Sequence, residues 1–232
     1  MNFPDFIAPY FSKEDEIYKV SEHIWGVAKE VRAQKLDSRQ KEKKIIMISG
    51  LSGAGKDSIV DELIKSRGEW TRLKTLTTRP RRPEESEEDD PYERVSVGTF
   101  EDYLRKGQIL EYTEYAGNFY GAKKGMIEKI LLANQTPVLI VDPKGASFYH
   151  QKWVEGDPLF ENATLIYLFV VPPSMTVLKE RLLNRSRDPE FVEKRIKQSQ
   201  DDITHIGQAE YIVINETGKL NDVVEQILEI LS

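Results

Sequence analysis

The sequence predicts an α/β fold in which a parallel sheet is covered by helices on both faces. From Lys43 onward, short runs rich in β-branched residues alternate with helical stretches. Most of these runs are continuously apolar, as strands buried on both faces are. Alternation of strand and helix favours parallel strands with ligands beyond their carboxyl ends. The 232 residues, 39% of them hydrophobic, are enough for one such domain with an appendage.

The expected elements follow one another along the chain. The predicted strands are residues 45–49, 72–76, 137–142, 164–171 and 210–215. Helices are predicted between and after them, at residues 57–66, 100–106, 124–133, 174–184, 190–206 and 220–231. These elements belong to one main domain, residues 43–232.

Residues 1–42 differ from the rest and predict a helical extension with a linker. Apolar residues at spacings of three and four indicate an amphipathic helix, with Ser12 as its possible N-cap: Ile17, Val20, Ile24, Val27 and Val31. The charged stretch LDSRQKEKK that follows is typical of a linker. We expect the helix to pack on the main domain or on a partner, and a homodimer is one such arrangement.

Composition excludes several classes of protein. The chain has no cysteine, which excludes disulfides, thiolate metal sites and a cysteine nucleophile. Its net charge of -6 argues against general binding of nucleic acid. No apolar stretch approaches the roughly 20 residues that span a bilayer, and the N-terminus lacks the pattern of a signal peptide. We therefore expect a cytoplasmic protein with neither nucleic acid nor membrane as a partner.

The stretch SGLSGAGKDSIV, directly after the first apolar run, predicts a phosphate-binding loop. It fits G-x-x-x-x-G-K, with glycines that let backbone N–H groups converge on a phosphate and a lysine for the β and γ phosphates. The following helix offers its positive N-terminal end. A glycine-rich turn with an exposed lysine is the alternative, but strand, glycines, lysine and helix occur in order. The expected ATP-binding residues of this loop are Gly50, Ser52, Gly53, Ala54, Gly55, Lys56, Asp57 and Ser58.

Asp57 departs from the usual pattern, in which a hydroxyl that holds magnesium follows the lysine. A carboxylate is a good ligand for a hard cation, and magnesium usually keeps several waters, so Asp57 could hold the ion directly or through water. It could also repel the nucleotide, or simply be a favourable acidic residue in the first helical turn. Metal binding and helix stabilisation both stay open at this point.

A second phosphate site is indicated by TLTTRPRR. Arg79 and Arg82 are three apart and anchored by prolines just after a predicted strand, so they can form a planar fork for a phosphate. A solvated basic turn is the alternative. The acidic run that follows, residues 84–90, is typical of a flexible solvated loop.

Taken together, several stretches resemble the guanylate kinase family. They are GLSGAGK, TLTTRPRR, YERVSVGTFEDYLRKGQILEYTEYAGNFYGAKKG, VLIVDPKGA, FVVPPSMTVLKERLLNR and YIVIN, in the family's order and spacing. The most specific is ILEYTEYAGNFYG. The resemblance implies a P-loop kinase three-layer fold with five parallel strands, a monophosphate-binding subdomain at residues 76–125 and a lid at 181–200. It also implies transfer of the γ-phosphoryl group of ATP to GMP or dGMP, with Mg²⁺.

The resemblance also implies residue roles. Arg79 and Arg82 would clamp the acceptor phosphate with Tyr92 and Tyr120, and Thr75 stands where the family usually has serine. Glu111 would accept hydrogen bonds from guanine N1 and N2, assisted by Asp142. Asn215 matches a residue near the adenine of the donor. With Lys56 and Arg79, the residues expected to act in catalysis are the lid arginines Arg181, Arg185 and Arg195, although a salt-bridged surface helix would show the same spacing.

Four features depart from the family's pattern and keep two alternatives open. They are Asp57, Ala122 in place of a hydroxyl residue that contacts the base, Ile140 in place of an aspartate near the metal, and a longer, more acidic loop before Tyr92. A ribose 1,5-bisphosphate kinase-like enzyme also uses a GKDS loop, and a non-catalytic guanylate kinase-like module binds phosphorylated peptide. Glu111 with the two tyrosines favours a guanine monophosphate, and Lys56 with the lid arginines favours catalysis.

Overall fold

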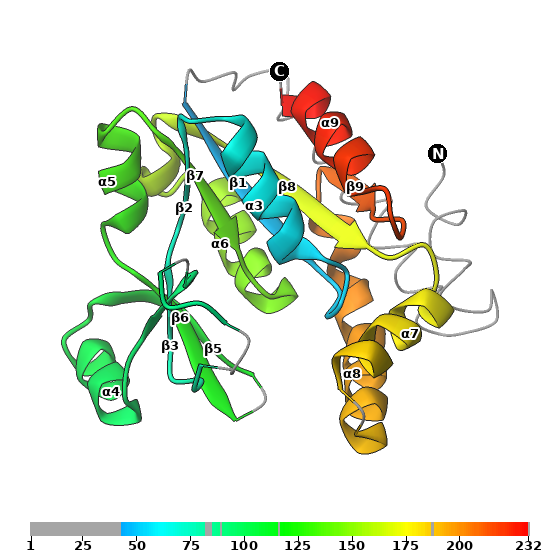
Figure 1. Cartoon of the computed structure of the whole chain (residues 1–232). Helices are drawn as coiled ribbons and strands as arrows, with labels where there is room; N and C mark the ends of the chain where they lie inside the picture. The colour runs from blue at the N-terminus through cyan, green and yellow to red at the C-terminus, as the bar shows by residue number, and fades with distance from the viewer. Residues whose placement is uncertain (1–42, 82–84, 89, 116, 187, 232) are drawn as a thin grey trace.

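The structure is a computed structural model that describes residues 43–81, 85–88, 90–115, 117–186 and 188–231 (Figure 1). The predicted N-terminal helix and Arg82 lie outside the described residues.

The main sheet confirms the predicted fold class. Its five strands are all parallel, in the order β2-β7-β1-β8-β9. Their bounds are β1 Lys43–Gly50, β2 Trp70–Arg72, β7 Thr136–Ile140, β8 Ala163–Val171 and β9 Tyr211–Ile214. The central strand β1 pairs with β8 along its whole length and is fully buried from Ile45 to Ile48. Burial on both faces explains why this strand is continuously apolar in the sequence.

Helices cover both faces of this sheet (Figure 1). Helices α3 (Lys56–Ser66) and α9 (Leu220–Leu231) pack on each other, and α6 (Pro143–Glu155) packs on β1 and β8 together with the 3₁₀ helix η2 (Ile203–Gln208). Helix α5 (Met126–Leu132) packs on β7, the short 3₁₀ helix η1 (Pro158–Phe160) packs on β8, and α7 (Met175–Arg185) packs on α8 (Pro189–Asp202). The predicted helix 190–206 therefore ends at Asp202 and continues as η2.

Helix α6 was not among the predicted helices, although its first turn carries a start signal. The side chain of Asp142 accepts a hydrogen bond from the backbone N–H of Gly145, and Pro143 occupies the first helical position. An aspartate N-cap followed by proline is a favourable way to begin a helix. Gly156, with φ 78°, ends it.

A second, four-stranded sheet has its own small core. Its order is β4-β3-β6-β5, with strands β3 Thr75–Thr77, β4 Tyr92–Arg94, β5 Ile109–Tyr115 and β6 Asn118–Lys123. Helix α4 (Val97–Arg105) begins at Ser96, whose hydroxyl accepts from the N–H of Thr99. Leu76, Phe100 and Ile109 form the core of this part.

The prediction of one strand at residues 72–76 is wrong, because this stretch supplies a strand to each sheet. Arg72 pairs with Val138 of β7 in the main sheet, whereas Thr75 pairs with Tyr92 of β4 in the small sheet. The chain therefore crosses from one sheet to the other within two residues, Leu73 and Lys74.

The small sheet and the α7–α8 pair project on either side of the end of the main sheet where β1 turns into α3 (Figure 1). Residues far apart in the sequence are thereby brought around one loop. None of the helices that the structure describes has the length and apolar character needed to cross a bilayer.

Candidate active site

One cavity of about 800 Å³ is lined by residues of the phosphate loop, the small sheet and the α7–α8 pair. Most of the residues singled out in the sequence line it: Gly50, Ser52, Gly53, Gly55, Lys56, Asp57, Ser58, Thr75, Arg79, Tyr92, Glu111, Tyr120, Asp142, Arg181, Arg185 and Arg195. Two others, Ala54 of the loop and Asn215 behind it, are buried. The fold thus gathers around one space residues that the sequence spreads over 146 positions, from 50 to 195.

The loop is shaped by close contacts at two glycines, one with backbone and one with a side chain. Gly50 has φ 138°, and a Cβ atom there would lie 2.0 Å from the carbonyl oxygen of Val170 in β8. Gly55 has φ 89°, and a Cβ atom there would lie 2.4 Å from Nδ2 of Asn215. Only glycine fits either position. Asn215 in turn donates from Nδ2 to the carbonyl oxygen of Ala54 at 2.7 Å, so it supports the loop from behind.

Lys56 turns its ammonium group toward the loop. Its Nζ donates to the carbonyl oxygens of Gly50 and Leu51, at 2.9 Å and 3.0 Å. Burial lowers the pKa of Lys56, while the negative charges of Asp57 and Asp202 oppose the decrease. A phosphate that enters the loop offers this ammonium charged acceptors in place of neutral carbonyls, which makes a stronger hydrogen bond.

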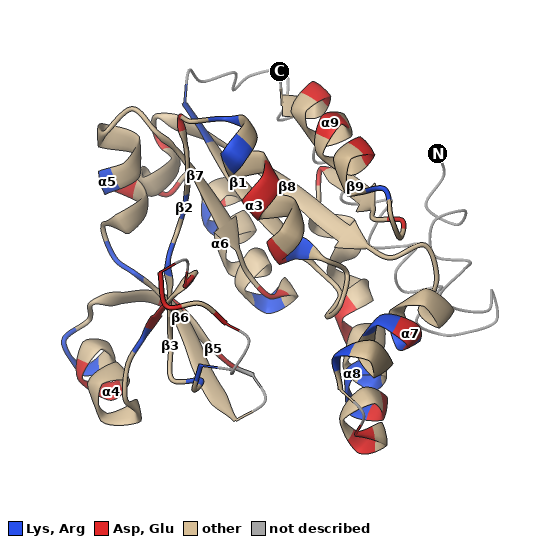
Figure 2. Ribbon diagram, viewed as in Figure 1, with Lys and Arg blue, Asp and Glu red and all other residues tan. Residues whose placement is uncertain are grey.

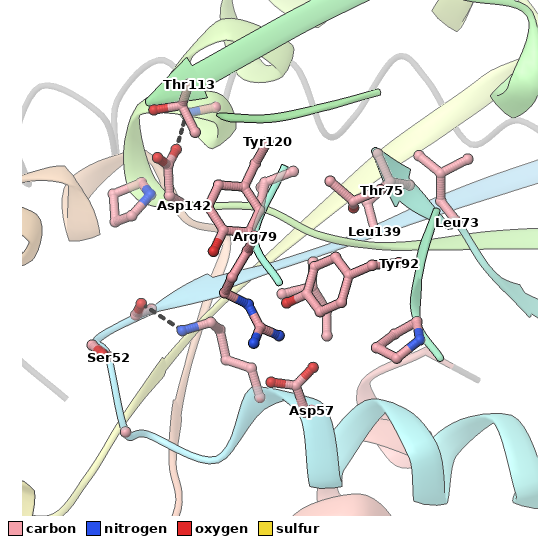
Figure 3. A pocket seen from close by; sticks show the side chains of 18 of the residues that line it. Ser52, Asp57, Leu73, Thr75, Arg79, Tyr92, Thr113, Tyr120, Leu139 and Asp142 are labelled. Atoms are coloured by element: carbon pink, nitrogen blue, oxygen red, sulfur yellow. Dashed lines mark hydrogen bonds between the residues drawn. The ribbon is translucent and has the colours of Figure 1, made fainter. Parts of the chain in front are cut away.

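Arg79, expected to hold the acceptor phosphate, has a carboxylate partner in the structure. Its guanidinium donates to Glu85 Oε1 at 2.6 Å, and Arg94 donates to the other oxygen of Glu85 at 2.7 Å. Both guanidinium groups lie over the ring of Tyr92, 5.4 Å and 5.3 Å from its centroid. Figure 3 shows Arg79, Tyr92 and Tyr120 directed toward one another beside the first turn of α3. The two guanidinium groups therefore form a binding site for an anion, which the carboxylate of Glu85 occupies in this structure.

The prediction that the acidic run is a solvated loop is wrong for two of its residues. Glu85 lines the cavity, and Asp90 is only 5% exposed. Asp90 accepts hydrogen bonds from Arg81 and Arg94 and from the backbone N–H of Tyr92. The Arg94 and Arg81 side chains and this N–H lower the pKa of Asp90 against the opposing effect of burial. Ion pairs with nearby arginines thus stabilise these two carboxylates at positions shielded from water.

Glu111 lies deeper in the cavity on β5, directly opposite Ala122 of β6. Burial raises the pKa of Glu111 to about 7, and the charge of Asp142 adds to the increase. Asp142 is also the N-cap of α6, and its Oδ1 lies 2.6 Å from the backbone nitrogen of Gly145. Burial deprives this carboxylate of hydrogen bonds to water. A ligand that donates N–H hydrogen bonds replaces them and stabilises the ionised form, so Glu111 is suited to bind such a ligand.

The three predicted lid arginines come from α7 and α8. Arg181 donates to the carbonyl oxygen of Asn215 at 2.7 Å and to Thr217 Oγ1 at 3.0 Å. The charge of Arg185 acts on Lys56 and helps to lower the pKa of that lysine. Arg195 lies over the ring of Phe191, 5.0 Å from its centroid. Lys and Arg gather where α7 and α8 meet (Figure 2), so this side of the cavity is basic.

The sequence did not point to four further charged residues of the cavity: Asp61, Arg72, Glu85 and Asp202. Arg72 pairs with Asp57 and, at 2.8 Å, with Asp61 of α3. Burial raises the pKa of Asp202 to about 6, and Lys56 opposes the increase. Each of these contacts joins residues from separate elements, so no local pattern in the sequence predicts them.

The described residues fit a metal ion that phosphates carry rather than an ion held by the protein alone. In the described part of the chain, no group of three or more His, Cys, Asp and Glu residues is arranged to hold a metal. Asp57 of α3, Asp142 just before α6 and Asp202 at the end of α8 line the cavity. Magnesium is usually bound by one or two carboxylates together with substrate phosphates and waters, and these carboxylates suit that arrangement.

The P-loop kinase fold is defined by a parallel sheet whose central strand is followed by a glycine-rich loop, a lysine and a helix. Basic residues of the small sheet and of α7–α8 face that loop across one cavity, as in nucleoside monophosphate kinases. The family model described as "Guanylate kinase" matches residues 42–232, and the chain belongs to this family. The predicted resemblance is confirmed.

Individual relatives agree with this assignment. The chain is 31% identical over 189 residues to guanylate kinase of Clostridium tetani, covering 81% of this chain and 85% of that protein. It is 36% identical over 173 residues to guanylate kinase of Thiobacillus denitrificans, covering 74% and 78%. The crystal structure of guanylate kinase from Anaplasma phagocytophilum is similar in fold, with a TM-score of 0.62 at 22% identity, covering 82% of this chain and 85% of that one.

Proposed function

We propose that this protein transfers the γ-phosphoryl group of ATP to GMP or dGMP, giving ADP and the corresponding diphosphate. The observation that carries the proposal is that Lys56 of the loop, Arg79 just after β3 and Glu111 of β5 line the same cavity. The loop suits the donor triphosphate, Arg79 the phosphate of the acceptor, and Glu111 its base.

The chemistry rests on positioning and charge. Phosphoryl transfer needs the attacking and leaving oxygens in line, with cations around the three equatorial oxygens of the transferred group. Lys56 lines the cavity from the loop, and Arg181, Arg185 and Arg195 line it from the α7–α8 pair. Mg²⁺ carried by the ATP would neutralise phosphate charge, and Asp57 or Asp202 would hold its waters. No covalent enzyme intermediate is required.

The same proposal makes nucleotides the ligands of this chain and gives the parts of the fold separate tasks. Residues 76–125 would hold the monophosphate, residues 181–200 would close over the transferred group, and residues 1–42 would contact the domain or a second copy. We expect neither nucleic acid nor a membrane as a partner, and a cytoplasmic location.

A coupled assay over a panel of acceptors tests the proposal. GMP, dGMP, AMP, IMP and ribose 1,5-bisphosphate are each offered with Mg²⁺ and ATP, and release of ADP is measured. Turnover of GMP or dGMP supports the proposal. Turnover of the sugar phosphate alone would favour the sugar-phosphate kinase that Asp57 suggests, and no turnover of any acceptor would favour a binding module.

Selectivity among purine acceptors is expected to be loose. Ala122 stands directly opposite Glu111 and has no hydroxyl to donate to the base, so one hydrogen bond to guanine is missing. We expect Ala122→Ser to lower the KM for GMP by about fivefold, the size of one hydrogen bond, without changing the KM for ATP. Steady-state kinetics with GMP, IMP and AMP measure this. Strict selectivity for GMP in the unmodified protein would contradict the expectation.

Asp57→Asn is expected to raise the Mg²⁺ concentration needed for half-maximal rate, because a neutral amide holds a water of the ion less strongly than a carboxylate. The affinity for GMP should change less than the magnesium requirement. A titration of the rate with Mg²⁺ at saturating ATP and GMP measures both. An unchanged magnesium titration would leave Asp57 with the role of a favourable residue in the first turn of α3.

A further inference from the structure

We propose that Arg72 is a positioning residue that makes the carboxylate of Asp57 compatible with donor phosphates on the loop. Because this carboxylate matters only if ATP phosphates bind next to it, this role rests on the proposed function. Arg72 lies on β2, outside the loop and outside the TLTTRPRR stretch.

Arg72 holds two carboxylates of the helix that the loop opens. One guanidinium nitrogen donates to Asp57, and the other donates to Asp61 Oδ1 at 2.8 Å. The two aspartates are four residues apart on α3, so they share one face of the helix. The side chain of Arg72 is only 15% exposed, whereas Asp57 is 62% exposed and Asp61 is 55% exposed. The arginine is therefore the packed partner that fixes the orientation of both carboxylates.

The backbone under Arg72 is also fixed. Arg72 pairs in register with Val138 of β7, and the next residue, Leu73, donates its N–H to the carbonyl oxygen of Val138 at 2.8 Å. A guanidinium presented from a paired strand loses little further freedom when it binds a carboxylate. Helix α3 also packs on β2. The pair therefore connects two elements that are already held against each other.

Charge explains why such a partner is needed. Asp57 follows directly after Lys56, whose charge it offsets, at the place where the triphosphate is to bind. A carboxylate at this place repels phosphate, although the 62% exposure of Asp57 lets water screen part of the repulsion. Arg72, Asp57 and Asp61 all line the cavity. By pairing with Asp57, Arg72 replaces a free negative charge beside the donor phosphates with a neutral pair.

A double-mutant cycle tests whether Arg72 acts through Asp57. Binding of the non-hydrolysable ATP analogue AMP-PNP with Mg²⁺ is measured by calorimetry for the unmodified chain, Arg72→Gln, Asp57→Ser and the double variant. We expect Arg72→Gln to weaken binding about tenfold when Asp57 is present, because it leaves a carboxylate unpaired near the phosphates. In the Asp57→Ser background only Asp61, about one helical turn further from the loop, loses its partner, so the same change should alter binding less than about twofold.

Two further variants keep the test decisive. Arg72→Lys keeps the charge and should retain most of the affinity, so it serves also if Arg72→Gln unfolds, which circular dichroism detects. Lys65→Gln removes a 69% exposed cation of the same helix and should leave binding unchanged. Equal loss on Arg72→Gln in both backgrounds, or no loss in either, would overturn the role of Arg72. A chain that binds AMP-PNP yet phosphorylates no acceptor would contradict the proposed function alone.

Discussion

Replacing Lys56 by alanine is expected to lower kcat for transfer to GMP by about 1,000-fold, the effect of removing one positioned donor from a developing charge. In the structure its ammonium donates to two carbonyl oxygens of the loop, Gly50 and Leu51, so it is already inside the loop before a nucleotide arrives. This preorganisation means that little rearrangement is needed when charge develops on the transferred group.

Coupled kinetics with saturating ATP and GMP measure the loss, and thermal unfolding checks that the variant is folded. Lys65→Gln, on the same helix but exposed, provides the matched control. If Lys56→Ala kept more than a tenth of kcat, the loop would not be holding the transferred phosphoryl group as proposed.

Replacing Glu111 by glutamine is expected to lower kcat/KM for GMP by about 100-fold while leaving the KM for ATP nearly unchanged. The carboxylate can accept from both guanine N–H groups, whereas an amide replaces one acceptor with a donor that opposes them. Steady-state kinetics with each substrate varied in turn separate the two effects. Glu114→Gln, an exposed residue of the same strand, is the matched control.

The pH dependence of the unmodified protein follows from the same residue. Burial raises the pKa of Glu111 to about 7, and guanine requires the ionised form. We therefore expect kcat/KM for GMP to fall below pH 7, by about tenfold for each further pH unit. The Glu111→Gln variant should lack this decrease. A profile that stays flat down to pH 5.5 would contradict the role of Glu111 as the acceptor of the base N–H groups.

Stability should move in the opposite direction from activity in Glu111→Gln. A carboxyl whose pKa rises from 4.5 in the unfolded chain to about 7 in the folded one favours folding only when protonated. Its contribution is full below pH 4.5 and is lost as the pH rises through 7. Glutamine resembles the protonated form, so at pH 8 the variant should unfold with a free energy higher by on the order of 3 kcal/mol, a gain that vanishes near pH 4. Urea unfolding at both pH values measures this.

The fold was predictable where strands are buried on both faces. The central strand β1 and its neighbour β8 are continuous apolar runs, and the residues that pack between helix layers must be apolar wherever they lie in the sequence. Strands β2 and β3 were not separable, because each has three residues and owes its place to its partners, β7 and β4. For so short a strand, pairing rather than local preference decides the structure.

The site residues also fall into those that the sequence could predict and those that it could not. The place of Lys56 and its glycines in the cavity could be predicted because a phosphate loop is a run of adjacent residues. The places of Arg79, Tyr92 and Glu111 could be predicted because their motifs resemble those of a family. The pairs Arg79–Glu85 and Asp57–Arg72 could not be predicted, because each depends on how separate segments come together. Their charges were visible in the sequence, but the distances that make them partners exist only in the folded chain.

Asn215 affects the order in which parts of this chain fold during synthesis. Its amide supports the carbonyl of Ala54 across 161 positions of the chain, so the loop at the start of the domain is completed by the residue that follows β9. We therefore expect the loop to reach its folded geometry during synthesis only after β9 has left the ribosome and paired with β8. ATP should therefore stabilise the finished domain but give no protection from proteolysis to nascent chains that stop before residue 210, although these already contain the whole phosphate loop.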